Sequence, residues 1–325
     1  MLSYKVKSPI LLIIFNRPET TIEVFNSIKL SKPTKLYIAA DGPRSSVVSD
    51  KLLCEKTREI VNQIDWNCNV RTLFRESNLG CKIAVSEAIS WFFENETEGI
   101  ILEDDVVPIS SFFPFCDELL EKYRYANNIG SITGNNLISE YFNPKESYFF
   151  SHYANIWGWA TWKRVWDNYD VDLRNWKTDK TSGVIDMFSD NTPFFSAYWK
   201  DQIDAIYSGK MDTWDFQFFL TCWKLNALCI VPKNNLIQNI GFGKLATHTT
   251  GSEPKCVTES YPKELSFPLT HPSKIYRSID ADRTINNNVF NIRLITLIKW
   301  KIRRIPYIGN VLSLIKRILI KLYSK

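Results

Sequence analysis

The sequence predicts an α/β protein in which a mostly parallel sheet is flanked by helices and followed by a basic, amphipathic, helical tail. Three observations lead to this prediction. Strand-like and helix-like segments alternate from Pro9 to Thr133, polar residues follow the expected strands, and the chain from Arg283 onward is basic and contains no acid.

The alternation of segments predicts the parallel sheet. Short apolar runs rich in β-branched residues are typical of buried strands, and apolar residues three or four apart between them predict helices. Parallel strands need such helical crossovers, so we expect helices on both faces of the sheet. The expected strands are Pro9–Pro18, Lys35–Pro43, Val70–Phe74, Gly99–Val107 and Ile129–Thr133, and the expected helices are Glu19–Leu30, Leu52–Ile64, Cys81–Phe93 and Ser110–Tyr125.

Polar residues follow each expected strand. The carboxyl ends of parallel strands meet at one edge of a sheet, and ligands of open α/β sheets bind there. We therefore expect these side chains to converge on one site: Asn16, Arg17, Asp41, Arg75, Glu103, Asp104, Asp105 and Asn135.

The acidic triplet Glu103–Asp105 directly follows the apolar run Ile100–Leu102. Adjacent carboxylates repel one another and are costly to desolvate, unless a cation and the hydroxyls of a ligand meet them. Mn²⁺ and Mg²⁺ bind carboxylate and phosphate oxygens together, so the triplet is a candidate site for a metal-bound diphosphate. The alternative is an acidic turn that caps the helix beginning near Ser110 or Ser111.

The second half contains a candidate general base. Asp215 lies between Trp214 and Phe216. Transfer of a sugar to a hydroxyl with inversion needs a base within hydrogen-bonding reach of that hydroxyl, and apolar surroundings make a carboxylate more basic. The alternative for Asp215 is an acid at a helix N-terminus, because Asp212 and Thr213 nearby are typical capping residues.

Two further features of the second half could bind an acceptor. Trp157 and Trp159, on either side of Gly158, are candidates for an aromatic wall against a sugar ring, with packing beneath the sheet as the alternative. His248 is a candidate contact for a metal or a phosphate, or a structural residue. Between these features, Arg174–Lys210 is expected to be helical and amphipathic.

Composition and charge exclude several classes of protein. No GxGxxG or GxxxxGK[ST] loop occurs near the strands, which removes the two common glycine loops for dinucleotides and nucleoside triphosphates. Seven cysteines without CxxC spacing indicate free thiols in a reducing compartment. Residues 1–282 carry 30 basic and 35 acidic residues, so the body is not expected to bind nucleic acid.

Six segments taken together, PILLIIFNRPETT, LYIAADGPR, NLGCKIAVSEAISWFF, ILEDDVVP, NIWGWATW and TWDFQF, resemble bacterial GT-A glycosyltransferases of the hemolysin-A-like group. That group is in turn similar to the N-acetylglucosaminyltransferase I family. The resemblance implies a GT-A (Rossmann-like) fold. It also implies that Asp105 ligates Mn²⁺ or Mg²⁺, that Glu103 accepts from the ribose with Asp104 nearby, and that Asp215 is the catalytic base.

The same resemblance assigns further contacts. Arg17 and Asp41 match nucleotide contacts, with Asp41 at the uracil, and Gly158-Trp159 falls in a mobile loop on the acceptor side. We include Arg75 and Lys82 among the nucleotide-binding candidates and Trp157 and His248 among the acceptor-binding candidates.

The expected function is metal-dependent transfer of a sugar from a nucleotide-sugar, with a UDP-sugar favoured, to a hydroxyl of a glycan or lipid-linked glycan. Asp215 would act as base with inversion, in the synthesis of a bacterial surface polysaccharide such as lipopolysaccharide or capsule. Two alternatives remain: an enzyme like the sugar-nucleotide pyrophosphorylases, and a non-catalytic glycan-binding or scaffold protein on a transferase fold.

The chain is expected to divide into a body, residues 1–282, and a tail, residues 283–325. Within the body, residues 1–147 would bind the nucleotide and residues 148–282 the acceptor. The tail carries ten Lys or Arg and apolar residues at helical spacing, which suits an anionic membrane surface. We therefore expect a cytoplasmic protein at the inner face of the cytoplasmic membrane, without a nucleic-acid partner. The alternative is a tail packed on the body or on a second copy in a homodimer.

Overall fold

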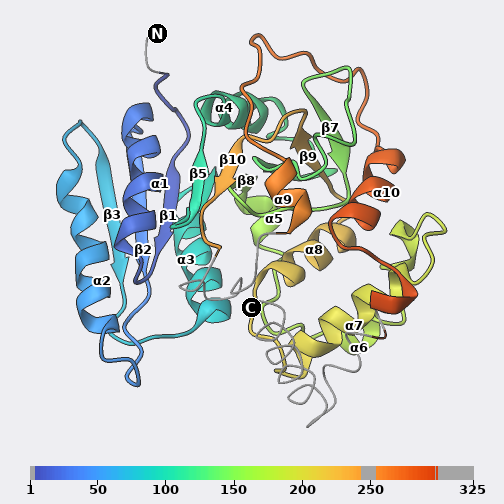
Figure 1. The fold of residues 1–325 in the computed structure, drawn as a ribbon, viewed down its shortest axis with the longest axis horizontal. Helices are drawn as coiled ribbons and strands as arrows, with labels where there is room; N and C mark the ends of the chain where they lie inside the picture. The colour runs from blue at the N-terminus through green and yellow to red at the C-terminus, as the bar shows by residue number, and fades with distance from the viewer. Residues whose placement is uncertain (1–3, 243–253, 297, 299–325) are drawn as a thin grey trace, which may run out of the picture.

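The computed structural model describes residues 4–242, 254–296 and 298. Its largest feature is a sheet of eight strands: β1 (Ile10–Ile14), β2 (Lys35–Ala40), β3 (Asn69–Phe74), β4 (Glu98–Glu103), β6 (Ile129–Thr133), β7 (Tyr148–Ser151), β8 (Trp159–Trp162) and β9 (Leu228–Pro232). These strands lie in the order β3-β2-β1-β4-β8-β6-β9-β7 (Figure 1). Two short strands, β5 (Val106–Pro108) and β10 (Ile237–Asn239), pair antiparallel in a second sheet.

The first half of the large sheet is parallel, as the alternation of segments predicts. β1 pairs with β2 and β4, and β2 pairs with β3, all in parallel. Helices connect these strands, and α1 and α2 lie together beside β1–β3 (Figure 1). The helical elements of this half are α1 (Pro18–Ser31), α2 (Asp50–Arg58), the 3₁₀ helix η1 (Glu59–Gln63), α3 (Cys81–Asn95) and α4 (Phe112–Lys122).

The second half of the sheet is mixed. β8 runs antiparallel between β4 and β6, β7 is antiparallel to β9, and β6 is parallel to β9. In the described part of the chain, four of the seven neighbouring strand pairs are thus parallel. The predicted α/β class with a mostly parallel sheet flanked by helices is confirmed.

The expected single strand Gly99–Val107 is wrong in one respect. β4 stops at Glu103, which is in register with Ile13 of β1. The chain then turns at Asp104 and Asp105 and continues as β5 in the second sheet. Two further carboxylates in the same extended strand would sit within the buried sheet without cations beside them, whereas the turn lets both meet Arg17.

Helices cover both faces of the sheet at β8. Trp159 packs against Phe218 of α8 (Asp215–Lys224), with ring centroids 4.7 Å apart. Trp162 points to the opposite face, where its indole N–H donates to the Leu120 carbonyl of α4 at 3.3 Å. Residues three apart in a strand point to opposite faces, so α8 and α4 lie on different faces of the sheet. The remaining helical elements are α5 (Lys163–Trp166), α6 (Trp176–Asp179), η2 (Asp186–Phe188), α7 (Phe195–Tyr207), α9 (Lys255–Glu259) and α10 (Ile279–Asn288).

The expected helix over Arg174–Lys210 is only partly present. The structure has α6, η2 and α7 there, separated by irregular chain with left-handed backbone at Asp190, Asn191 and Phe194. L-residues in this conformation interrupt a right-handed helix, and this is why one continuous helix does not form.

The expected boundary after Asp282 is also corrected. It falls inside α10, where Ala281 and Ile285 are buried in the core, and Ile292 is buried beyond the helix. The body therefore extends at least to Ile292. Residues 297 and 299–325, which hold most of the expected amphipathic tail, lie outside the described residues. None of the described helices is long and apolar enough to span a bilayer.

We predict that Gly99→Ala destabilises the fold by about 1–3 kcal/mol, because a Cβ on Gly99 would lie 2.7 Å from Cε1 of Phe92 and 2.8 Å from the Pro9 carbonyl oxygen. Denaturant unfolding of the single variants and of Gly99→Ala combined with Phe92→Leu measures the effect. In the double variant, the smaller side chain at position 92 should recover part of the free energy of unfolding that Gly99→Ala loses. If the losses of the two single variants simply add, overpacking against Phe92 is not the cause.

Candidate functional site

The strand ends bring the predicted residues to one edge of the sheet. β1, β2, β4 and β6 are oriented alike, so their carboxyl ends share this edge, and β8 begins there because it runs the other way. The register places Glu103 beside Ile13, and Trp159 beside both Ile101 and Thr133. Arg17, Asp41 and the acidic turn therefore follow strands that end at this edge, and the Trp157–Trp159 segment enters β8 at the same edge.

Arg17 neutralises two of the three acids. Its Nη2 pairs with Asp104 Oδ1, and its Nη1 lies 2.9 Å from Asp105 Oδ2. Asp104 is almost fully buried and also accepts from the Phe15 N–H at 3.3 Å. Arg17 is held in turn by the start of α1, where its carbonyl accepts from the N–H and hydroxyl of Thr21. The acidic turn and the β1–α1 connection thus form one linked unit.

Negative charge exceeds positive charge at the acidic turn. Burial, followed by the charges of Asp105 and Asp104, raises the pKa of Glu103 well above its ordinary value. Burial likewise raises the pKa of Asp104, although Arg17 opposes that shift. One guanidinium serves three carboxyl groups, whose hard oxygen donors suit Mg²⁺ or Mn²⁺. A bound cation would also favour the ionised form of these acids.

The segment after β10 packs on Asp105. The Ile240 N–H donates to the Asp105 carbonyl at 2.8 Å. Gly241 lies so close to the Asp105 side chain that a Cβ there would be 2.7 Å from its Cγ. The segment that follows the second sheet therefore fixes the position of the Asp105 backbone. Because residue 241 is a glycine, this segment can pack directly against the Asp105 carboxylate.

Asp41 organises the neighbouring loop. Its carboxylate accepts from the N–H groups of Leu79 and Gly80, at 3.0 and 3.2 Å, and from the Asn78 amide at 2.8 Å. Burial raises the pKa of Asp41, and these hydrogen bonds partly offset that shift. Gly80 has a positive φ of 80°, which strains glycine less than it would strain any other residue. It ends the loop at the start of α3. Asp41 thus holds residues 78–80 at the site edge.

Arg75 and Lys82 flank this loop. Arg75 pairs with Glu87 at 3.1 Å and its charge acts on Asp41. The Lys82 ammonium lies 3.7 Å from the Asp172 carboxylate of the second half. Both predicted nucleotide-binding residues therefore border the same region.

Asp215 is the first residue of α8, as the capping alternative predicts. Its Oδ1 accepts from the Phe216 N–H at 3.0 Å and from the Thr213 hydroxyl. Its charge also acts on Glu103 and on Cys81. Burial raises the pKa of the Cys81 thiol, and the charges of Glu103, Asp215, Asp212 and Asp41 raise it further. The carboxylates whose charges act on this thiol come from both halves of the chain.

The expected acceptor residues differ in their exposure. Trp157 is partly buried and meets Phe242 edge-on, with centroids 5.9 Å apart. Gly158 has a positive φ of 59°, and its carbonyl accepts from the Gly134 N–H at 2.6 Å. Trp159 is fully buried and stacks on Trp214, so in this structure its ring is a core element and not a wall open to a sugar. His248 lies outside the described residues.

Several site residues were not predicted from the sequence. The Asp212 carboxylate lies close to Gly80, and its charge contributes to the raised pKa of the Cys81 thiol. Asn78 holds Asp41, and Gly241 covers Asp105. Among these residues, only those in the NLGCK run could have been found from the sequence, because an asparagine and a glycine directly before a helix are typical of an ordered loop. The approach of residue 241 to the acidic turn depends on long-range pairing that local patterns do not encode.

A second cluster of ionisable groups lies apart from this site. His152 and Asp282 are fully buried, with Nδ1 and Oδ2 3.3 Å apart, and Asp190 completes a His/Asp/Asp group whose spacing could hold a metal ion. Arg277 already supplies a cation there: it pairs with Asp190, and its Nε lies 3.3 Å from Asp282 Oδ2. A metal ion would have to displace this guanidinium.

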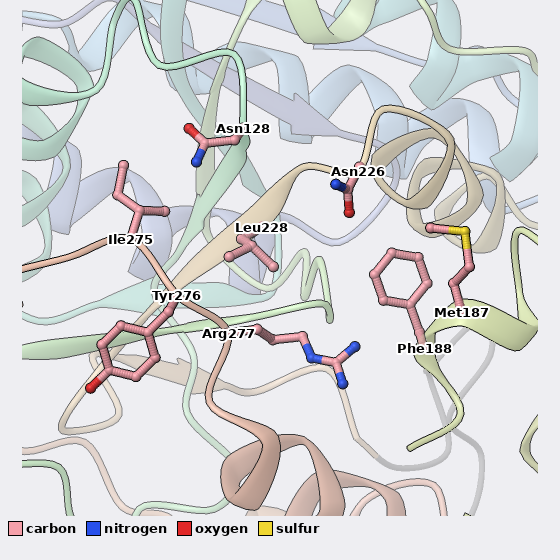
Figure 2. Close-up of a pocket in the computed structure, with 8 residues that line it drawn as sticks. All are labelled: Asn128, Met187, Phe188, Asn226, Leu228, Ile275, Tyr276 and Arg277. Atoms are coloured by element: carbon pink, nitrogen blue, oxygen red, sulfur yellow. The ribbon is translucent and has the colours of Figure 1, made fainter. Parts of the chain in front are cut away.

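A cavity of about 380 Å³ lies beside Arg277 (Figure 2). Its lining includes Asn128, which precedes β6, and Leu228, which begins β9. Asn128 and Leu228 thus mark the amino ends of β6 and β9. The carboxyl ends of these two strands lie at the opposite edge of the sheet, where the acidic turn is. The cavity therefore opens at the edge of the sheet opposite the acidic turn and is not part of the candidate site.

No family model matches the chain, and no curated protein matches it. Solved structures with some similarity include HddC from Yersinia pseudotuberculosis, with 7% identity and a TM-score of 0.31 over 50% of this chain and 80% of that one. Mouse xyloside xylosyltransferase 1, in its apo form, gives 10% identity and a TM-score of 0.30 over 66% and 81% of the two chains. Apo UDP-glucose pyrophosphorylase gives 9% and 0.33 over 69% and 90%. At these TM-scores the similarities carry no functional assignment, which has to come from the site residues.

We predict that Asp282→Asn changes the pH dependence of stability. Burial raises the pKa of Asp282 to about 7 from 3.8, so the folded protein holds a proton there that the unfolded chain releases. Between these pH values wild-type stability falls as pH rises, and the amide removes this loss. The variant should therefore gain at least about 1 kcal/mol relative to wild type from pH 4 to pH 7, measured by denaturant unfolding. Asp280→Asn, on the exposed side of α10, is the control, and parallel profiles for wild type and Asp282→Asn would contradict the prediction.

Proposed function

We propose that this protein is a GT-A glycosyltransferase that moves a sugar from a nucleotide-sugar, with a UDP-sugar favoured, to a hydroxyl group. The observation that supports the proposal is that Arg17, Asp41 and the acidic turn follow β1, β2 and β4 at the carboxyl edge of these parallel strands. The charge of Asp215 acts on Glu103 at the end of β4, which supports including Asp215. A site with both excess carboxylate and a guanidinium suits a ligand that has sugar hydroxyls and a diphosphate.

The nucleotide would bind over the first half of the sheet. Asp41 and the loop of residues 78–80 would meet the base, with backbone groups of the loop positioned by the Asp41 carboxylate. Glu103, at the end of β4, would accept from the ribose hydroxyls. Arg17 would meet the diphosphate, for which a planar guanidinium with several N–H donors is well suited.

Asp105 would hold the divalent cation. Mn²⁺ or Mg²⁺ bound there supplies neutralisation of the charge that builds up on the diphosphate as it leaves. The excess of carboxylates over guanidinium at this turn supports the assignment.

Asp215 would act on the acceptor. Asp215 is the first residue of α8, and a carboxylate placed within reach of the acceptor hydroxyl can accept its proton. The acceptor oxygen forms a bond to the anomeric carbon while the bond from that carbon to the phosphate oxygen breaks. The electron pair leaves with the nucleoside diphosphate, and the hydroxyl proton passes to Asp215. Attack from the face opposite the leaving group inverts the anomeric centre.

We place the enzyme in the synthesis of a bacterial surface polysaccharide, on the cytoplasmic side of the membrane, with a glycan or lipid-linked glycan as acceptor. The support is the tail sequence, in which ten Lys or Arg and no acid follow Asp282. A basic amphipathic segment suits an anionic membrane surface, where a lipid-linked acceptor would be found.

The proposed activity predicts different effects for two acids. Calorimetry should show UDP binding that Mn²⁺ strengthens in wild type, and Asp105→Asn should lose this metal dependence. Asp215→Asn should still bind UDP. Its rate of UDP formation, measured with a panel of sugar-nucleotides as donors, should be about 10²–10⁴-fold lower than that of wild type. Asp167→Asn, an exposed acid paired with Lys163, is the control for both measurements. UDP binding without turnover of any donor in wild type would favour a non-catalytic protein, and no UDP binding would overturn the nucleotide-sugar assignment.

The membrane proposal predicts that truncation after Ile292 releases the protein from anionic vesicles. Ile292 is buried and Phe290 packs on Tyr153, so cutting after them preserves the core contacts of this segment. Co-sedimentation with vesicles that contain phosphatidylglycerol measures binding, with neutral phosphatidylcholine vesicles as the control. A truncated protein that sediments as well as the full chain would contradict the proposal.

A further inference from the structure

Arg17 occupies the position that a cation would take at Asp105. Its Nη1 lies 2.9 Å from Asp105 Oδ2, while its Nη2 pairs with Asp104 and its Nε lies 3.4 Å from the other Asp104 oxygen. The side chain is only 19% exposed. A divalent cation binds carboxylate oxygen at roughly 2.0–2.2 Å, so an ion on Asp105 Oδ2 would lie close to a guanidinium of the same sign of charge.

The surroundings leave this oxygen little freedom to turn away. The Asp105 carbonyl is bound to the Ile240 N–H, and Gly241 crosses the carboxylate. The backbone of Arg17 is fixed by Thr21, which donates to the Arg17 carbonyl, so neither partner is on a loose loop. Displacing Arg17 without a replacement would also leave its charge and that of the buried Asp104 unpaired, which is unfavourable.

We propose that Arg17 and the divalent cation compete for Asp105, so that the metal binds tightly only together with the nucleotide. This inference rests on the proposed function, because the diphosphate is the group that draws Arg17 away. Arg17 is then a positioning residue. In the empty enzyme its guanidinium neutralises the acidic turn. When the nucleotide binds, the guanidinium pairs with phosphate oxygens in place of Asp104 and Asp105, and Asp105 becomes free to bind the metal. Metal and nucleotide binding are coupled for this reason, and the coupling is reciprocal.

The test measures binding of Mn²⁺ alone, without nucleotide, by calorimetry and by the electron paramagnetic resonance signal of free Mn²⁺. Wild type should bind MnCl₂ weakly at Asp105, and Arg17→Met should bind it at least about tenfold more tightly, within the usual range of coupling between sites. Arg17→Lys should give an intermediate affinity, because an ammonium keeps the charge but cannot span two carboxylates. Adding Asp105→Asn to Arg17→Met should abolish the gain, which places the bound ion at Asp105.

Arg124→Met is the matched control. Arg124 also pairs with a carboxylate through two nitrogens, at 2.7 and 2.8 Å, but its partner Glu98 is at the other end of β4. This variant should bind Mn²⁺ as wild type does. Circular dichroism and thermal unfolding establish that each variant is folded, and Arg17→Lys serves as the test if Arg17→Met is not.

The outcomes separate this inference from the proposed function. Equal Mn²⁺ affinity in wild type and a folded Arg17 variant would overturn the competition, even if UDP binds with metal as proposed. Absence of UDP binding to wild type, with and without Mn²⁺, would instead overturn the function, whereas tighter Mn²⁺ binding in Arg17→Met would still show that Arg17 blocks Asp105.

Discussion

The ion pairs of Arg17 with Asp104 and Asp105 are the constraint on which the candidate site depends. A buried strand that ends in three carboxylates needs a cation beside it, and the chain supplies one from the connection between β1 and α1. The same contact joins the ends of two neighbouring parallel strands. The position of the acidic turn is therefore set by charge as well as by the backbone pairing of β1 with β4.

A similar principle holds at the end of β2. Asp41 is buried and receives hydrogen bonds from a loop that starts beyond β3, so a carboxylate again fixes a connection that has no regular structure of its own. Arg58 adds a second link by donating to the carbonyl of Asp41 at 3.1 Å. Acids at this edge thus order the loops that surround the candidate site.

Local sequence patterns were enough to predict the parallel half of the fold. β1, β2, β3 and β6 and the helices α1, α2 and α3 begin close to the expected residues, because their apolar spacing reflects burial directly. The antiparallel insertion of β8 was not predicted, since nothing in the four tryptophans of Asn155–Trp166 specifies which strands they pair with. For the same reason the full burial of Trp159 was missed: an aromatic-rich run is compatible with packing and with ligand binding alike. Asp215 lies at the N-terminus of α8, as one of its two interpretations expects, and its charge also acts on Cys81.

The antiparallel strand β8 has a mechanical consequence. It is hydrogen-bonded to β4 of the first half and to β6 of the second, so the two halves share one continuous sheet. Bending between them would break backbone pairs in the middle of that sheet. The spacing between the strand ends on either side of β8 is therefore rigid, and chains with this architecture would accommodate ligands of different size by changing the loops at the rim.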